Sequence, residues 1–159
     1  MSQQRERRER DALAALNIIK LSVGTDSVET LRAWQDGRVA LAQRRLGKPL
    51  LWHTTRMVPK RQAELLEGGS IYWVIKGVVQ ARQRIIGFDD GHKEDGTPCC
   101  LVMLDRKLVM VRPTPKRPFQ GWRYLPGEEA PPDLGADASD GLAAMPPALR
   151  RELAELGLL

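Results

Sequence analysis

The sequence has little of what most catalytic and metal sites are built from. Its 159 residues include two histidines, His53 and His92, and two cysteines, Cys99 and Cys100, which are neighbours. Adjacent cysteines seldom form a disulfide because the geometry is strained. The pattern therefore favours a reduced, cytoplasmic protein. These four residues match no zinc-ligand spacing, so we expect no metal site and no cofactor.

Long apolar runs and nucleotide or nucleophile motifs are also missing. No run approaches the roughly 20 apolar residues that span a bilayer, and the N-terminal residues are too highly charged for a secretory signal. We therefore expect no membrane partner. The sequence has no Gly-x-Ser-x-Gly elbow, no Walker loop and no dinucleotide fingerprint. No catalytic residue is assigned, and a non-catalytic function is favoured.

What is present is positive charge, unevenly distributed. Residues 16–126 hold 19 Lys and Arg against 10 Asp and Glu, whereas residues 127–159 hold two against seven. A basic domain attracts polyanions, above all nucleic acid. Composition predicts four segments: a charged arm (1–15), a single basic domain (16–126), a disordered acidic linker rich in Pro, Gly and Ala (127–146), and a short amphipathic helix (147–159).

The order of elements predicts an α+β fold. LNIIKLSV (16–23) is typical of a strand, and the capping-box spacing of Asp26 and Glu29 predicts a helix that continues to Leu46. LLWHTTRM (50–57) predicts a second strand. A short helix begins at Pro59 and is followed by a meander of at least four strand segments.

The most strand-like stretch, GGSIYWVIKGVVQARQRII (68–86), carries unexpected charge. Side chains alternate along a strand, so Lys76, Arg82 and Arg84 share one face with Tyr72 if the strand is unbroken. The apolar residues Ile71, Trp73 and Ile75 then form the opposite face, which belongs to the core. Gly77 marks a point where the strand bends or bulges.

A second basic cluster lies between positions 106 and 123, with six cations and no acid, interleaved with Phe119, Trp122 and Tyr124. Cations contact phosphates, and aromatic rings stack on unpaired bases, so this mixture suits RNA. In the alternative, the aromatics pack into the protein and the arginines stay solvated. The predicted surface for RNA or another polyanion consists of Arg56, Lys60, Arg61, Lys76, Arg82, Arg84, Arg117, Trp122 and Arg123.

Two other functions stay open. In the first, a small hydrolase or base-modifying enzyme has a pocket where the second strand, the short helix and the third strand converge. Such chemistry requires a pocket that shifts pKa values. The candidate pocket residues, beside Lys60 and Lys76, are His53, Glu64, Ser70 and Tyr72. In the second, an interaction adaptor docks through its acidic tail, which can also fold back over the basic face.

Three blocks carry a family resemblance: SVETLRAWQ, TRMVPKRQAELLEGGSIYWVIKGVVQARQRI and RPFQGWRYL. They resemble the signature blocks of an uncharacterised alphaproteobacterial family, domain-of-unknown-function family 1489, over residues 16–134. The resemblance implies a small cytoplasmic bacterial protein and transfers no catalytic residue.

The order of elements is similar to that of the PUA-like β-barrels, a superfamily with RNA-binding modules and relatives that bind modified bases or act as small hydrolases. The resulting prediction is an α+β fold with a mixed, partly closed, PUA-like barrel and two helices, followed by the linker and the terminal helix. An open α+β sandwich with helices on one face is the competing architecture.

Overall fold

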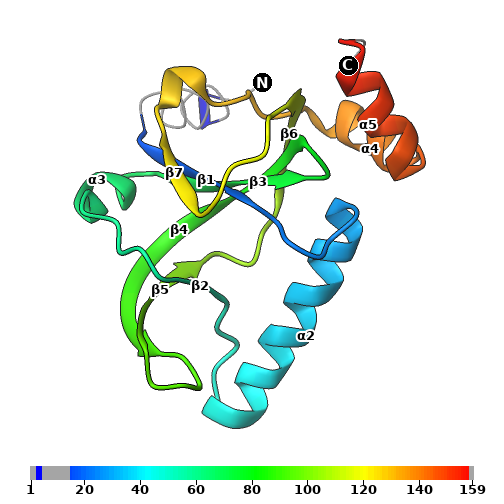
Figure 1. Cartoon of the computed structure of the whole chain (residues 1–159). Helices are drawn as coiled ribbons and strands as arrows, with labels where there is room; N and C mark the ends of the chain where they lie inside the picture. The colour runs from blue at the N-terminus through cyan, green and yellow to red at the C-terminus, as the bar shows by residue number, and fades with distance from the viewer. Residues whose placement is uncertain (1–2, 5–14, 158–159) are drawn as a thin grey trace.

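A computed structural model describes residues 3–4 and 15–157, so most of the predicted charged arm (1–15) lies outside the described residues. The described chain forms one seven-stranded mixed sheet that curls into a half-barrel, with α2 along one side (Figure 1). The strands are β1 (Asn17–Leu21), β2 (Trp52–Thr55), β3 (Ser70–Ile75), β4 (Val78–His92), β5 (Pro98–Leu104), β6 (Val109–Pro115) and β7 (Trp122–Leu125). The helices are α2 (Val28–Leu46), α3 (Gln62–Leu65), α4 (Ala136–Ala143) and α5 (Pro147–Glu155).

The strand order is β2-β5-β4-β3-β1-β7, and β6 pairs with β4 outside this path. Only β1 and β3 run parallel among the described strands. The long strand β4 joins the two parts of the sheet: its first half pairs with β3 and β6, and its second half pairs with β5. A register shift between Ile85 and Gly87 lies where the partner changes, and bulges of this kind bend a sheet. The predicted α+β class with a mixed, partly closed sheet is confirmed.

The stretch predicted as one bent strand is a hairpin. Lys76 (φ 50°) and Gly77 (φ 78°) form a two-residue turn between β3 and β4, and positive φ at both positions is the requirement of a type I′ turn. Lys76 is therefore a turn residue and not part of a strand face. Tyr72 pairs with Arg82 across the hairpin, so these two do share a face, as the alternation predicts.

The sheet has an apolar cluster on each face, because neighbouring residues of a strand point to opposite sides. Ile18 belongs to the larger cluster, which packs against α2 through Val28 and Leu31. Ile19 belongs to the smaller cluster, against which Ala130 of the C-terminal segment packs. Both faces of β1 and β3 are thus covered.

Helix α2 begins one residue later than the capping-box pattern predicts. Ser27 is the N-cap, and its Oγ accepts a hydrogen bond from the Thr30 backbone N–H at 3.1 Å. The helix ends at Gly47, whose positive φ of 73° suits a glycine C-cap. No helix among the described residues has the length and apolar character needed to cross a bilayer.

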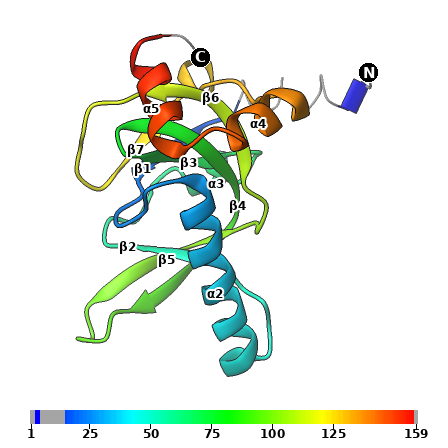
Figure 2. The same cartoon turned by 90° about the vertical axis from the view of Figure 1, so that its right-hand side faces the viewer.

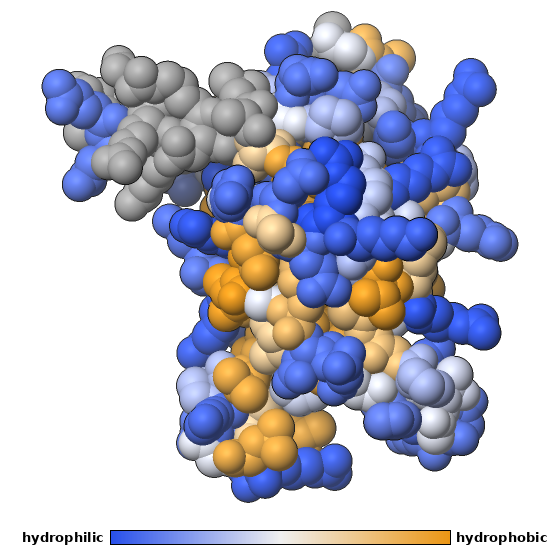
Figure 3. Space-filling model, turned by 90° about the vertical axis from the view of Figure 1, so that its left-hand side faces the viewer, coloured by the Kyte–Doolittle hydropathy of each residue, from blue (hydrophilic) through white to orange (hydrophobic). Residues whose placement is uncertain are grey.

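Gly69 is required by a close approach of backbone segments. A Cβ at this position would fall far inside contact distance of the carbonyl oxygens of Leu16 and Leu65. The end of α3 can therefore pass against the start of β1 only with glycine here. The face that carries α3 shows apolar patches among hydrophilic surface (Figure 3), and the exposed apolar residues next to α3 include Met57, Val58 and Leu66.

The C-terminal segment differs most from the sequence prediction. Residues 127–146, predicted as a disordered linker, contain a 3-10 turn (Gly127–Glu129), a bridge between Asp133 and Val111, and α4. Helix α5 then contacts β6, and both helices lie at one end of the half-barrel (Figure 2). The acidic composition predicts disorder only if its charges lack partners.

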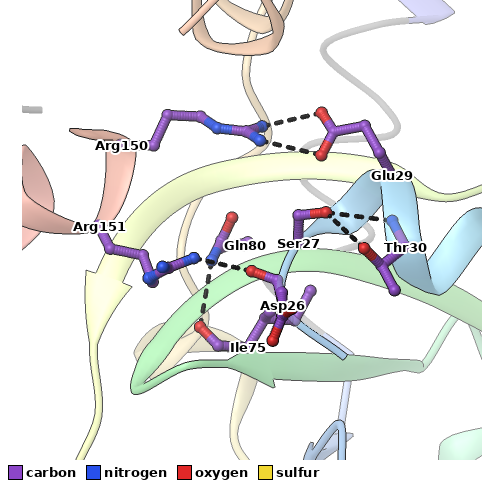
Figure 4. Close-up of polar contacts among 8 residues, drawn as sticks. All are labelled: Asp26, Ser27, Glu29, Thr30, Ile75, Gln80, Arg150 and Arg151. Carbon is purple, nitrogen blue, oxygen red and sulfur yellow. Dashed lines mark hydrogen bonds and ion pairs between the residues drawn. The ribbon is translucent and has the colours of Figure 1, made fainter. Parts of the chain in front are cut away.

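Two ion pairs join this segment to the rest of the protein. Arg82 pairs with Asp133, and Arg150 of α5 donates from both Nη atoms to Glu29 of α2 at 3.0 and 2.9 Å. Figure 4 shows this second pair, together with Arg151, which donates to the Asp26 carbonyl at 2.7 Å. These contacts fix α5 to the N-terminal turn of α2.

Candidate binding groove between α2 and β2

Arg82, a residue of the predicted basic face, forms its contacts within the protein. Its Nε lies 2.7 Å from Asp133 Oδ1, its Nη2 lies 2.6 Å from Oδ2, and its Nη1 donates to Ser70 Oγ at 3.0 Å. The neighbouring Tyr72 is buried, and this burial raises its pKa to about 12. Arg82 is therefore not available to a ligand phosphate.

Trp122, predicted as a base-stacking residue, packs inside the protein. It is 6% exposed, its Nε1 donates to the Met57 carbonyl at 2.8 Å, and its ring meets Tyr124 edge to face at 4.9 Å. The Tyr124 hydroxyl in turn accepts the backbone N–H groups of Lys60 and Arg61. This aromatic pair joins β7 to the loop after β2 and offers no open ring face for a base.

The other predicted surface cations are exposed, but several have partners of their own. Arg61 is ion-paired with Glu64. Arg123 stacks on Phe119 at 4.8 Å. Lys76 lies 3.4 Å from Asp26. The predicted cations without a carboxylate partner among the described residues are Arg56, Lys60, Arg84, Arg117 and Arg123.

The predicted enzyme pocket residues are not brought together. His53 contacts Trp73, whereas Tyr72, the next residue of β3, points to the opposite face of the sheet. Ser70 is buried and accepts the hydrogen bond from Arg82. Glu64 is exposed on α3.

Two cavities lie between α2, β2 and the end of β1, and of the predicted pocket residues only His53 lines one of them. An inner cavity of about 190 Å³ and an outer cavity of about 400 Å³ share Arg38, Trp52 and Thr54. Together they form one groove along α2, from Leu31 in the inner cavity to Leu46 in the outer one. At 1.5 Å per helical residue this stretch is roughly 20 Å long. We call it the α2–β2 groove.

Positive side chains line the α2–β2 groove, and no carboxylate of the described residues lines it. Lys20 comes from β1, and burial lowers its pKa. Arg38 and Arg45 come from α2, and neither has a carboxylate partner within the described part of the chain. The Arg38 guanidinium lies 4.4 Å from the Trp34 ring centroid, so the ring holds it at the groove.

His53 provides the only groove atom that is buried, polar and without a hydrogen-bond partner among the described residues, its Nε2. The imidazole meets Trp73 edge to face at 5.3 Å. Burial lowers the pKa of His53 to about 4, assisted by the charges of Lys20 and Arg38, so the ring is neutral at pH 7. An unpaired buried nitrogen costs about 1–3 kcal/mol, a cost that a ligand atom bound there would remove.

Aromatic rings complete the groove. Trp34 is 56% exposed and Trp52 is half-buried. The inner wall is rigid, because Gln83 Oε1 accepts hydrogen bonds from both Gln35 Nε2 and Trp73 Nε1 at 2.8 Å. The groove is therefore a preformed, positively charged surface with flat rings near its opening.

Sequence reasoning placed only His53 of these residues in a site. It missed Lys20, Trp34, Arg38, Arg45 and Trp52. One local signal was present: Trp34 and Arg38 are four residues apart, a spacing that puts both on one side of a helix. The spacing alone does not say whether this side of the helix is buried or exposed. No cluster of His, Cys, Asp and Glu in the described ranges has the arrangement of a metal site.

Comparison with known proteins gives one match. A family described as "Protein of unknown function (DUF1489)" matches residues 18–159. No curated protein and no solved structure matches the chain.

Proposed function

Because the chain belongs to the DUF1489 family, as its sequence blocks predicted, and the description of that family assigns no function, we propose a function from the groove itself. The protein is a nucleic-acid-binding module that takes up unpaired nucleotides, in RNA above all, along the α2–β2 groove. In this proposal the domain binds nucleic acid as a PUA-like module and catalyses no reaction.

One observation carries this proposal: the α2–β2 groove combines cations that lack carboxylate partners with the exposed Trp34 and the half-buried Trp52. Arg38 and Arg45 are placed to contact phosphates. Trp34 is 56% exposed beside them, with the Arg38 guanidinium over one face of its ring. Single-stranded nucleic acid is bound by this combination, because every base has a face that stacks and every linkage carries a negative charge.

The size of the groove agrees with a short strand. Stacked nucleotides rise by about 3.4 Å each, so a stretch of roughly 20 Å accommodates a handful of them. The exposed cations Arg56, Lys60, Arg84 and Arg117 add to the positive field that draws a polyanion toward the protein. Arg82 and Trp122 support the fold and take no part in the proposed contact.

The test is a salt-dependent titration of labelled, mixed-sequence single-stranded RNA with the full chain. Arg38→Glu is compared with Arg44→Glu, which makes the same charge change on the same helix but does not line the groove. We expect Arg38→Glu to weaken binding by about tenfold or more and Arg44→Glu by much less. Trp34→Ala is expected to weaken binding and to reduce the quenching of tryptophan fluorescence by RNA.

Two results would overturn the proposal. One is the absence of binding at low salt, or an affinity that does not fall as salt is raised, since phosphate contacts release counterions. The other is an equal loss in Arg38→Glu and Arg44→Glu, which would mean that net charge and not the groove determines affinity.

A further inference from the structure

The inner cavity of the α2–β2 groove differs from the outer one in its polar groups. Lys20 of β1, Arg38 of α2 and His53 of β2 converge there from three separate elements. Their nearness is reflected in the charges of Lys20 and Arg38, which act on the imidazole of His53. The outer cavity has Arg45 in addition to the shared Arg38, and apolar side chains form most of the walls of both cavities.

From this arrangement, and resting on the proposed function, we propose that the inner cavity binds a terminal phosphate monoester of the strand. The protein then binds the phosphorylated end of an RNA, and the following nucleotides lie along the outer cavity.

The hydrogen-bonding capacity of the three groups supports a monoester. The Lys20 ammonium donates to the Leu21 carbonyl at 3.1 Å and keeps two further N–H donors. Arg38 has its ring contact with Trp34 and its planar set of donors. His53 lines the same cavity, and its Nε2 has no hydrogen-bond partner among the described residues.

The net charge of the cavity lining also favours a phosphate monoester. Converging cations repel one another, and no carboxylate among the described residues that line the cavity compensates them. A phosphate monoester carries about −1.5 to −2 charges at pH 7 and three free oxygens. An interior phosphodiester carries one charge and two free oxygens, so it neutralises the cluster less well.

The size of the cavity favours a strand end. The cavity holds about 190 Å³. A phosphodiester brings a ribose on each side of its phosphate, whereas a monoester brings one ribose and leaves it toward Trp34 and Trp52.

The experiment compares one short oligoribonucleotide in three forms: with a 5′-phosphate, with a 3′-phosphate, and with hydroxyl groups at both ends. We expect one phosphorylated form to bind the full chain at least about tenfold more tightly than the hydroxyl form. The form that gains affinity identifies the end that is bound.

Variants assign this preference to the cavity. Lys20→Met keeps the aliphatic stem and removes the charge, so it should weaken binding of the phosphorylated form much more than binding of the hydroxyl form and bring the ratio of the two affinities close to one. Arg45→Met in the outer cavity should weaken both forms alike and preserve their ratio. Addition of a nucleoside monophosphate should raise the pKa of His53 measured by NMR, and the nucleoside alone should not.

The outcomes separate the two proposals. Equal, salt-dependent binding of all three forms overturns end recognition and leaves the groove proposal standing. A preference that survives in Lys20→Met also overturns it, because the phosphate would then be bound elsewhere. If no form binds, the proposed function fails together with the inference.

Discussion

Arg82 of β4 and Asp133 of the C-terminal segment form a two-point ion pair between positions 51 residues apart in the chain, with N–O distances of 2.7 and 2.6 Å. The side chains are 14% and 21% exposed, so solvent screens the pair only in part. The same guanidinium donates to Ser70. A charge that the sequence assigns to a ligand surface thus fixes the C-terminal segment to the sheet.

Asp133→Asn is expected to destabilise the protein. It leaves the Arg82 guanidinium largely buried without its counter-charge, and the expected loss is about 1–3 kcal/mol in the free energy of unfolding. Urea denaturation measures it. Glu128→Gln, an exposed acid of the same segment, is the matched control and should stay within about 0.5 kcal/mol of wild type. Equal stabilities of the two variants would show that the pair does not hold the segment.

The contact between α5 and α2 should weaken in acid. The hydrogen bonds from Arg150 hold the pKa of Glu29 below its ordinary value of 4.5. A carboxyl whose pKa is lower in the folded state stabilises the protein above the unfolded value, and this contribution is lost as pH falls through the folded one. The Glu29 side chain is 52% exposed, so the effect is small.

Glu29→Gln tests this contact. The stability difference between wild type and Glu29→Gln should be largest above pH 4.5 and should shrink in more acidic solution. Hydrogen exchange of α5 amides should increase in the variant. A stability difference that does not change with pH would contradict the assigned role of the carboxylate.

His53 should make stability depend on pH in a higher window. Its pKa is about 4 in the folded protein against an ordinary 6.5, so the unfolded chain takes up the proton first. Stability is therefore lost as pH falls from 6.5 to about 4, by about 3 kcal/mol in total. His53→Asn removes this term, and chemical denaturation across the window compares the two proteins. A parallel pH dependence in both would show that the buried imidazole is not its source.

The hydrogen-bond network of Gln35, Trp73 and Gln83 beside the groove predicts different stability losses for two Gln→Leu variants. Gln83 is fully buried and accepts hydrogen bonds from Gln35 and Trp73, whereas Gln35 bonds only to Gln83 among the described residues. Gln83→Leu takes the hydrogen-bond partner from the Gln35 amide, from Trp73 Nε1 and from the Asp105 carbonyl. It should cost about 2–4 kcal/mol, and Gln35→Leu should cost less. The double variant should be no less stable than Gln83→Leu alone. Equal costs for the single variants, measured by denaturation, would contradict the network.

Substitution of two tryptophans should distinguish a residue that stabilises the fold from a residue that binds RNA. Trp122 is 6% exposed and Trp34 is 56% exposed. Trp122→Ala should cost about 3–5 kcal/mol in unfolding free energy because it leaves a cavity and frees the Met57 carbonyl. Trp34→Ala should change stability little and RNA affinity more. Both variants are measured by thermal denaturation and by the RNA titration. A large stability loss in Trp34→Ala would contradict the exposed position of Trp34 at the groove.

Sequence patterns predicted side-chain positions correctly where neighbouring residues alone determine them. Alternation in β3 placed Ile71, Trp73 and Ile75 in the core, because successive side chains of a strand point to opposite faces. It failed at Lys76, because a two-residue turn interrupts the strand there. It could not place Trp34, because helical spacing groups residues on one side but does not say which side meets the sheet.

The family, the α+β class, the mixed and partly closed sheet, and the excess of positive charge outside the C-terminal segment could all be predicted from the sequence. They depend on sequence blocks, on the order of the elements and on composition. Which charges pair inside the protein is seen only in the folded chain. Arg82 and Arg150 meet carboxylates far away in the chain, whereas Lys20, Arg38 and His53 meet at one cavity without any. The reason is that pairing of charges depends on distances in space, which folding sets and local sequence does not.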